Sequence, residues 1–137
     1  MKIYIDTSVI GGCFDEEFAE WSNKLFDEFR KGKKVAVVSD QTLQELEKAP
    51  NQVKKLIQSV PVDYFFMIEL DDEARLLAKR YIQEGVINRK HLVDAQHIAM
   101  ATIYHVDFLA SVAIPKFTYF FLHKSTQMAL PLFCYRF

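Results

Sequence analysis

The spacing of hydrophobic residues along the chain switches repeatedly between the patterns typical of strands and of helices. Short apolar runs rich in β-branched or aromatic residues predict strands, and apolar residues that recur every three to four positions predict helices. The predicted strands are 2–5, 35–38, 64–68 and one that begins at 108–110. The predicted helices are 16–31, one that starts at 39 or 40 and ends before Pro50, then 52–59, 73–84 and 92–105.

Small and polar residues mark several ends of these elements. Gly32 and Gly85 each follow a predicted helix, where glycine readily adopts the left-handed conformation that ends helices. The turn Asp-Thr-Ser at 6–8 follows the first strand and can cap a helix. Because strands alternate with helices, the pattern predicts an α/β fold, a layered sandwich with parallel strands.

Composition limits the class of protein. Of the 137 residues, 50% are hydrophobic and 26% are charged, so we expect residues 1–137 to form a single globular domain. Charged residues interrupt every apolar run before the roughly 18 residues that a membrane span requires, so we expect no membrane association. Asp6 likewise leaves no room for a signal-peptide core. With only Cys13 and Cys134, we expect neither a disulfide framework nor a cysteine metal site, which favours a cytoplasmic location.

The charges are distributed unevenly along the chain. The formal net charge is −1, so the protein as a whole creates no positive field that would attract nucleic acid. All acidic residues lie between Asp6 and Asp107. The segment 112–137 is instead rich in aromatic residues, namely Phe117, Tyr119, Phe120, Phe121, Phe133, Tyr135 and Phe137. The composition therefore changes sharply near Ser111.

Three acidic residues are predicted to meet at one edge of the sheet. Asp6 comes directly after the first strand, Glu45 lies in the helix after the second, and Asp94 begins the helix that leads to the fourth. In parallel sheets, functional groups gather beyond the carboxyl ends of the strands. Converging carboxylates repel one another unless a cation lies between them or some are protonated. Such oxygen ligands favour Mg²⁺ or Mn²⁺, which can activate water for attack on a phosphate.

Simpler interpretations of each acid remain open. Asp6 and Asp94 can be helix caps and Glu45 a solvated helix residue, because exposed acids are common in all proteins. A phosphatase that uses Asp6 as its nucleophile, in the manner of haloacid dehalogenases, is a weaker interpretation. That chemistry needs a second Asp two residues later, where this chain has Ser8.

Three segments carry these acids in order: 2–10 (KIYIDTSVI), 39–46 (SDQTLQEL) and 94–102 (DAQHIAMAT). Each resembles one acidic motif of the PIN-domain family, which includes the VapC-type toxin ribonucleases of bacterial toxin–antitoxin modules. The resemblance covers residues 1 to about 111. It implies a PIN-like three-layer sandwich, in which helices flank a central, mainly parallel sheet of four or five strands.

The resemblance also implies an activity, that of a Mg²⁺- or Mn²⁺-dependent RNA endonuclease. Asp6, Glu45 and Asp94 would be the catalytic residues and metal ligands, with Glu47 a less favoured substitute for Glu45. The implied partners are single-stranded or structured RNA, an antitoxin protein if the chain is the toxin of a pair, and a second copy in a homodimer.

Further residues are candidates for contact with RNA. Thr7 or Ser8 would orient water or phosphate in the implied site. His97 lies one turn after Asp94, where it can approach the site or simply pack as a helix residue.

Two basic segments are candidates to hold the phosphate backbone. Arg89, Lys90 and His91 precede Asp94 and therefore lie nearer to the predicted site. The denser cluster at 30–34 is better explained as the solvated, basic end of a helix.

The chain departs from the family pattern after the fourth strand. There, PIN domains usually carry another acid, or Asn in the subgroup that this chain most resembles, often as Ser-Trp-Asn. Here Ser111 is followed by Val-Ala-Ile-Pro, and no acid or Asn occurs downstream. Asp107 precedes the strand and is better explained as a turn residue. The incomplete ligand set favours an alternative function, that of a catalytically degenerate PIN protein which binds RNA or a protein partner without cleavage. The altered segment has two explanations, a shifted reading frame or divergence to a different last element.

Overall fold

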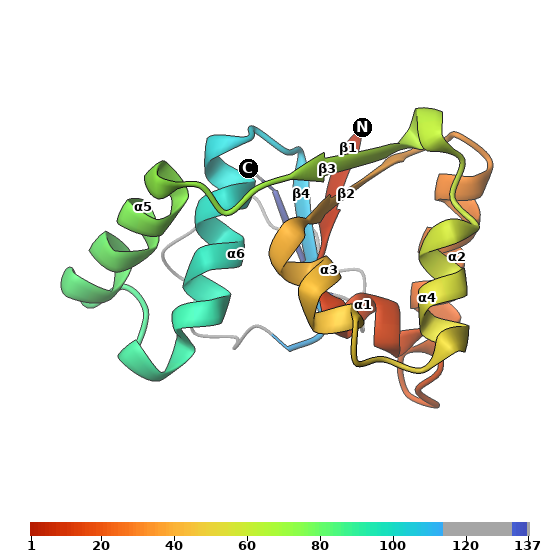
Figure 1. Ribbon diagram of the computed structural model, residues 1–137, viewed down its shortest axis with the longest axis horizontal. Coiled ribbons are helices and arrows are strands. Elements are labelled where there is room, and N and C mark those ends of the chain that lie inside the picture. The colour runs from red at the N-terminus through yellow and green to blue at the C-terminus, as the bar shows by residue number, and fades with distance from the viewer. Residues whose placement is uncertain (114–132, 137) are drawn as a thin grey trace.

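Five strands form one sheet at the centre of the protein (Figure 1). The computed structural model describes residues 1–113 and 133–136. The strands are β1 (Lys2–Ile5), β2 (Val35–Ser39), β3 (Phe65–Ile68), β4 (Phe108–Ser111) and β5 (Phe133–Arg136), and their order in the sheet is β3-β2-β1-β4-β5. The first four are parallel and β5 is antiparallel to β4, which confirms the predicted, mainly parallel sheet. Of the aromatic-rich segment, 114–132 and 137 lie outside the described residues.

Six α-helices connect the strands in the described part of the chain. They are α1 (Thr7–Gly12), α2 (Ala19–Arg30), α3 (Asp40–Leu46), α4 (Asn51–Gln58), α5 (Asp72–Gln83) and α6 (Leu92–Ile103). Two single turns of 3₁₀-helix, Val62–Tyr64 and Arg89–His91, precede β3 and α6. Within the described residues, no helix is long and apolar enough to cross a membrane.

The helices cover both faces of the sheet and bury a separate apolar core on each. Alternation along β1 shows the division, because Ile3 and Ile5 pack with α1, α2 and α4, whereas Tyr4 faces α5 and α6. Val37 of β2 and Leu109 of β4 lie on the Tyr4 side. Figure 1 shows the two groups of helices on opposite sides of the strands, which confirms the predicted three-layer sandwich.

The largest differences from the predicted helices lie near the N-terminus. The segment after Asp6 was predicted only as a turn that can cap a helix, yet it continues into the six-residue α1, which buries Val9 and Ile10. The second helix begins at Ala19 instead of residue 16, because Asp15 starts a turn in which its backbone carbonyl accepts from the amides of Phe18 and Ala19. The side chain of Asp15 also accepts from the Glu17 amide.

The strand ends place polar residues at one edge of the sheet. Asp6 follows β1, Ser39 is the last residue of β2 and Ser111 the last residue of β4. Because β1 is paired in parallel with both β2 and β4, these three positions lie side by side at the carboxyl edge. Asp107 lies at the opposite edge, where its carboxylate accepts from the Lys2 amide at 2.7 Å, as expected of a structural turn residue.

Candidate functional site

Asp6 is the centre of the polar groups at the carboxyl edge. It is only 4% exposed and forms the N-cap of α1, where its Oδ1 accepts from the Val9 amide at 3.1 Å. The hydroxyl of Ser8 donates to the same oxygen at 2.5 Å. The hydroxyl of Ser111 donates to Oδ2, also at 2.5 Å. Asp6 is therefore a helix cap, as the simpler interpretation has it, whose second oxygen points toward β4.

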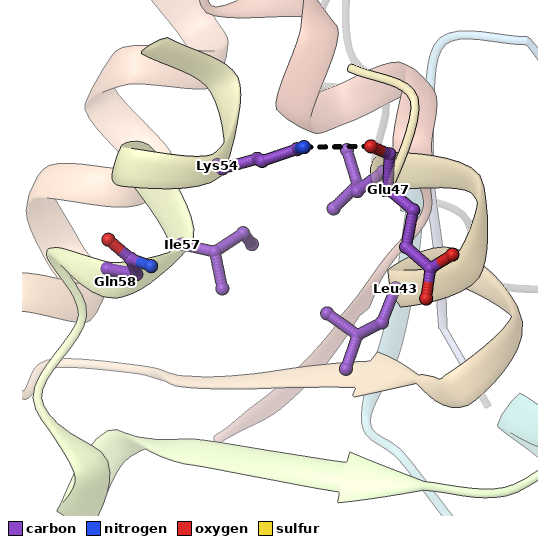
Figure 2. A pocket seen from close by; sticks show the side chains of 6 residues that line it. Leu43, Glu47, Lys54, Ile57 and Gln58 are labelled. Atoms are coloured by element: carbon purple, nitrogen blue, oxygen red, sulfur yellow. Dashed lines mark hydrogen bonds between the residues drawn. The ribbon is translucent and has the colours of Figure 1, made fainter. Parts of the chain in front are cut away.

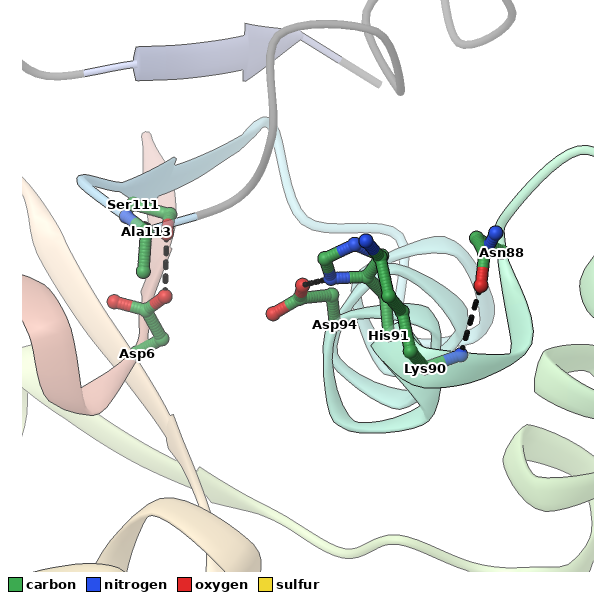
Figure 3. Close-up of polar contacts among 7 residues, drawn as sticks. All are labelled: Asp6, Asn88, Lys90, His91, Asp94, Ser111 and Ala113. Atoms are coloured by element: carbon green, nitrogen blue, oxygen red, sulfur yellow. Dashed lines mark hydrogen bonds and ion pairs between the residues drawn. The ribbon is translucent and has the colours of Figure 1, made fainter.

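Ser111 is a member of the site that the sequence did not identify. Besides its bond to Asp6, its hydroxyl accepts from the Ala113 amide at 3.1 Å (Figure 3). The neighbouring Val112 amide donates to the Ser8 hydroxyl at 3.0 Å. The chain after β4 is thus fastened to the start of α1. The available signal was the position of Ser111 at the end of a strand that neighbours β1.

Glu45 reaches the site from α3. Ser39 begins this helix, and its hydroxyl accepts from the Thr42 amide at 3.1 Å in a standard N-cap. Glu45 is exposed, and its carboxylate accepts a short hydrogen bond from the hydroxyl of Thr7. The two hydroxyls predicted to orient water or phosphate are therefore each bonded to a predicted ligand, Thr7 to Glu45 and Ser8 to Asp6.

Asp94 lies in the first turn of α6. Figure 3 shows its carboxylate projecting from α6 toward β1 and β4. Its Oδ2 lies 3.1 Å from Nδ1 of His91. Burial raises the pKa of Asp94, and the neighbouring imidazoles of His91 and His97 partly offset this effect. The charge of Asp6 raises the pKa of Asp94 further, as expected for carboxylates that share one site.

The three carboxylates also act together on one buried group, His97. Burial lowers the pKa of this histidine, while the charges of Asp6, Glu45 and Asp94 each oppose the decrease. The three acids, which follow β1 or lie on α3 and α6, thus influence the same histidine, and their convergence on one cation stays a prediction.

His97 itself does not face outward. It is 3% exposed, and its Nδ1 lies 2.6 Å from the hydroxyl of Tyr4. The enclosed side chain agrees with the simpler interpretation, that His97 packs as a helix residue against Tyr4 of β1. A contact between His97 and RNA stays a prediction.

The donor set can be tested for its fit to a divalent cation. Within residues 1–113 and 133–136, no three or more His, Cys, Asp or Glu side chains are grouped closely enough to hold a metal ion. Mg²⁺, however, commonly keeps several waters and needs only one or two carboxylates. Asp6 and Asp94 supply such oxygens, and burial of Asp6 leaves its carboxylate few water contacts to lose. The chemistry of these oxygens is thus compatible with a hydrated Mg²⁺ or Mn²⁺ ion, while the ligand set Asp6, Asp94 and Glu45 stays a prediction.

Structural comparison identifies the fold. At the level of sequence, the chain matches no protein-family profile and no curated protein. Its structure is similar to that of VapC20 of Mycobacterium tuberculosis, described as a sarcin-ricin loop cleaving toxin, with a TM-score of 0.59 and 12% sequence identity. The similarity covers 90% of this chain and 98% of VapC20. The chain has a PIN-like fold.

In this PIN-like fold, Ala113 takes a position of special interest. Counted from Ser111, it corresponds to the Asn of the Ser-Trp-Asn pattern that the resemblance predicts after the fourth strand. The Ala113 amide and the Asp6 carboxylate share the Ser111 hydroxyl (Figure 3). Ala113 therefore has a methyl group where the resemblance predicts an amide oxygen.

The two basic segments at 89–91 and 30–34 lie at opposite edges of the sheet. Arg89 and Lys90 are exposed in the 3₁₀ turn that leads into α6, and the Lys90 amide donates to Oδ1 of Asn88 (Figure 3). They share this end of α6 with Asp94. The cluster at 30–34 lies before β2 and thus at the opposite edge of the sheet.

Within that cluster, cations are bonded to neighbouring side chains. Lys31 pairs with Asp27 and Lys34 with Glu28, each at 2.5 Å. Arg30 donates to the hydroxyl of Ser59 at 2.9 Å. These contacts agree with the interpretation of the cluster as a solvated helix end.

Glu47 lines a pocket between α3 and α4 (Figure 2). The pocket has a volume of about 320 Å³ and is lined by Leu43, Leu46, Glu47, Lys54, Ile57 and Gln58. The Glu47 carbonyl accepts from Lys54 of α4 at 2.7 Å, whereas Figure 2 shows the Glu47 carboxylate turned away from α4. Glu45 accepts from Thr7, which follows Asp6, so the geometry favours Glu45 over Glu47.

Proposed function

We propose that the protein is a PIN-type RNA endonuclease that requires Mg²⁺ or Mn²⁺ and uses Asp6, Asp94 and Glu45. The observation that carries this proposal is the geometry of the carboxyl edge, where Ser8 and Ser111 hold the buried Asp6 carboxylate and the adjacent Thr7 donates to Glu45 of α3. Burial of acids at the carboxyl edge of a parallel sheet costs stability, and such a cost is common at functional sites.

The residues of the site would have distinct roles in the proposed reaction. Asp6 and Asp94 would hold the hydrated cation, which supplies a water of lowered pKa and a positive charge beside the phosphate. Ser8 and Ser111 fix the orientation of the Asp6 carboxylate through their hydrogen bonds. His91 keeps Asp94 oriented and favours its ionised form.

Other groups would position the RNA. Thr7 donates its hydroxyl proton to Glu45 and would fix that carboxylate for contact with RNA or the cation. Arg89 and Lys90, exposed at the start of α6, would contact phosphates and so raise affinity without reading bases. This division predicts weak sequence preference from these contacts alone.

The proposed biological role is that of the toxin of a toxin–antitoxin pair, acting in the cytoplasm. The similarity to VapC20 supports this role, because that protein is described as an RNA-cleaving toxin. An antitoxin protein that covers the acidic edge and a homodimer are the corresponding expected partners. The RNA target of VapC20 is not transferred to this chain, since 12% identity shows the fold alone.

A second candidate function is a degenerate PIN protein that binds RNA or a protein partner without cleavage. The observation that favours it is Ala113, which offers no ligand oxygen where PIN domains usually carry an acid or Asn. The sequence contains no acid after Asp107. In this alternative, Arg89 and Lys90 keep their role in RNA binding while the carboxylates are inactive.

Cleavage of labelled RNA separates the two functions. A panel of single-stranded and hairpin RNAs would be incubated with protein in Mg²⁺, Mn²⁺ or EDTA. The nuclease proposal predicts cleavage that EDTA abolishes and that Asp94→Asn reduces by at least about 100-fold. Asp63→Asn, an exposed acid before β3, is the matched control and should cleave normally. RNA binding without cleavage by folded wild-type protein would favour the degenerate binder.

A further inference from the structure

A chain of four buried polar side chains runs beneath the three carboxylates. Nδ1 of His97 lies 2.6 Å from the Tyr4 hydroxyl, and this hydroxyl donates to Ser39 Oγ at 2.9 Å. Ser39 Oγ in turn donates to Thr42 Oγ1 at 3.1 Å. All four side chains are buried, and Tyr4 is fully enclosed. The chain crosses from α6 through β1 to the end of β2 and the start of α3.

The hydrogen bonds of this chain have one consistent direction. A tyrosine hydroxyl has a single proton, and Tyr4 gives it to Ser39, so Nδ1 of His97 must donate to Tyr4. The direction therefore assigns the Nδ1–H form to His97.

Three members of the hydrogen-bonded chain, Tyr4, Ser39 and His97, lie on or next to the elements that position the three predicted metal ligands. Tyr4 stands two residues before Asp6 on β1. Ser39 is the N-cap of α3, the helix that carries Glu45. His97 lies one turn after Asp94 on α6. The hydroxyl of Tyr4 thus joins the three elements that carry the three carboxylates.

The apolar surroundings of Tyr4 make these hydrogen bonds important for the relative positions of α6, β1 and α3. Val37, Ile98 and Leu109 belong to the same apolar cluster as Tyr4, so they offer no polar substitute for a lost side-chain partner. A buried polar group without a partner is costly, and the network is satisfied in the arrangement described. Small rotations of α6 or α3 relative to β1 would break it.

We propose that Tyr4 is a positioning residue whose hydroxyl fixes Asp6, Glu45 and Asp94 relative to one another for cation binding. The proposal rests on the proposed function for the role of the cation. The placement of the carboxylates, however, is a property of the metal-free protein and can be measured separately.

Tyr4→Phe isolates the hydroxyl, because it keeps the ring that packs against His97 at a centroid distance of 5.7 Å. The matched control is Tyr104→Phe. Tyr104 donates to Asp71 at 3.2 Å from the far end of α6, away from the carboxylates. Circular dichroism and thermal melting would first establish that both variants are folded.

The first measurement compares backbone amide chemical shifts in metal-free protein. Tyr4→Phe should shift the amides of Asp6, Glu45 and Asp94, although the last two lie on other elements, and Tyr104→Phe should leave them unchanged. If the amides of Glu45 and Asp94 move no more in Tyr4→Phe than in the control, the positioning claim is overturned.

The second measurement is the midpoint of a Mn²⁺ titration followed by electron paramagnetic resonance. Groups that orient metal ligands typically change affinity by about 10- to 100-fold, so the midpoint in Tyr4→Phe should rise by at least about tenfold. A shifted set of amides with an unchanged midpoint would overturn the link to cation binding. If wild-type protein binds no Mn²⁺ at these residues, the proposed function fails, while the amide shifts still decide whether Tyr4 positions the carboxylates.

A pair of His97 variants tests the same bond from its other side. The amide nitrogen of Asn occupies roughly the place of Nδ1, whereas that of Gln reaches the place of Nε2. His97→Asn should therefore keep a donor to Tyr4 and retain a midpoint near that of wild type, and His97→Gln should resemble Tyr4→Phe. The reverse order would contradict the contact between Tyr4 and Nδ1 of His97.

Discussion

The hydroxyl of Ser111 donates a 2.5 Å hydrogen bond to Oδ2 of Asp6, which joins the ends of β4 and β1. Both residues are buried, so loss of this donor leaves a carboxylate oxygen poorly compensated. We expect Ser111→Ala to lower the free energy of unfolding by roughly 1–3 kcal/mol. Urea denaturation followed by circular dichroism measures the change.

Ser22 offers a matched control on α2. It is equally buried, but its hydroxyl has no hydrogen-bond partner among the described residues. Removal of an unsatisfied polar group costs little, so Ser22→Ala should be neutral or slightly stabilising. Equal losses in the two variants would mean that the bond to Asp6 contributes nothing beyond the packing of a small side chain.

Ala113 provides a gain-of-function test. It occupies the position where the family resemblance predicts Asn, and its amide bonds the same Ser111 hydroxyl that holds Asp6 (Figure 3). Ala113→Asn would add a hard oxygen ligand near the proposed cation, so the Mg²⁺ concentration for half-maximal RNA cleavage should fall by about tenfold. Ala113→Leu adds comparable volume without an oxygen. If both variants have the same Mg²⁺ requirement, the residue does not complete the ligand set.

The raised pKa of Asp94 predicts that its ionised carboxylate lowers the free energy of unfolding and that this effect depends on pH. An acid whose pKa is higher in the folded protein favours folding while it is protonated, and this contribution is lost as pH rises through its folded pKa. Asp94→Asn is neutral at every pH. Its melting temperature should therefore exceed that of wild type increasingly above about pH 4 and match it at lower pH.

Thermal unfolding from about pH 3 to pH 7 measures this difference. Asp63→Asn removes an exposed carboxylate before β3 and controls for the general effect of net charge. An Asp94→Asn protein that is less stable than wild type at neutral pH would show that His91 stabilises the carboxylate more than burial destabilises it.

The strands and long helices were predictable because their apolar residues repeat with a clear period. Helix α1 was missed because only six residues form it, too few for a helical period to stand out from a turn. Asp6 and Asp94 became candidates because Asp6 directly follows a predicted strand and Asp94 lies in the first turn of a predicted helix, whereas Glu45, near the end of α3, was indicated mainly by the family resemblance.

The contacts among those positions were not predictable from the sequence. The bond between Ser111 and Asp6 depends on the register of β4 against β1, which pairs Ala110 with Ile5. The inward orientation of His97 depends on how α6 packs against Tyr4. Periodicity gives the faces of a helix but not the partner that each face meets.

Gly32 and Gly85 form a natural pair for a test of the fold. Both have positive φ, 68° and 72°, a conformation that costs other residues roughly 1–2 kcal/mol. A Cβ atom at Gly32 would also overlap the ring of Tyr64, whereas one at Gly85 meets nothing within 4 Å. Gly32→Ala should therefore destabilise the protein more than Gly85→Ala does.

The difference between the two glycine variants, measured by urea denaturation, isolates the collision with Tyr64. A Tyr64→Ala background should remove most of that difference, because the ring is then absent. Equal destabilisation by both glycine substitutions in the wild-type background would contradict the described packing between the end of α2 and β3.

The central claim is that the carboxylates at the carboxyl edge hold a divalent cation. Paramagnetic broadening of backbone amide signals by substoichiometric Mn²⁺ tests it directly, because the broadening identifies the residues around the ion. We predict that amides near Asp6, Glu45 and Asp94 broaden first and that Asp94→Asn removes the effect. Broadening centred on the exposed acids of α5, or spread evenly over the surface, would contradict the claim.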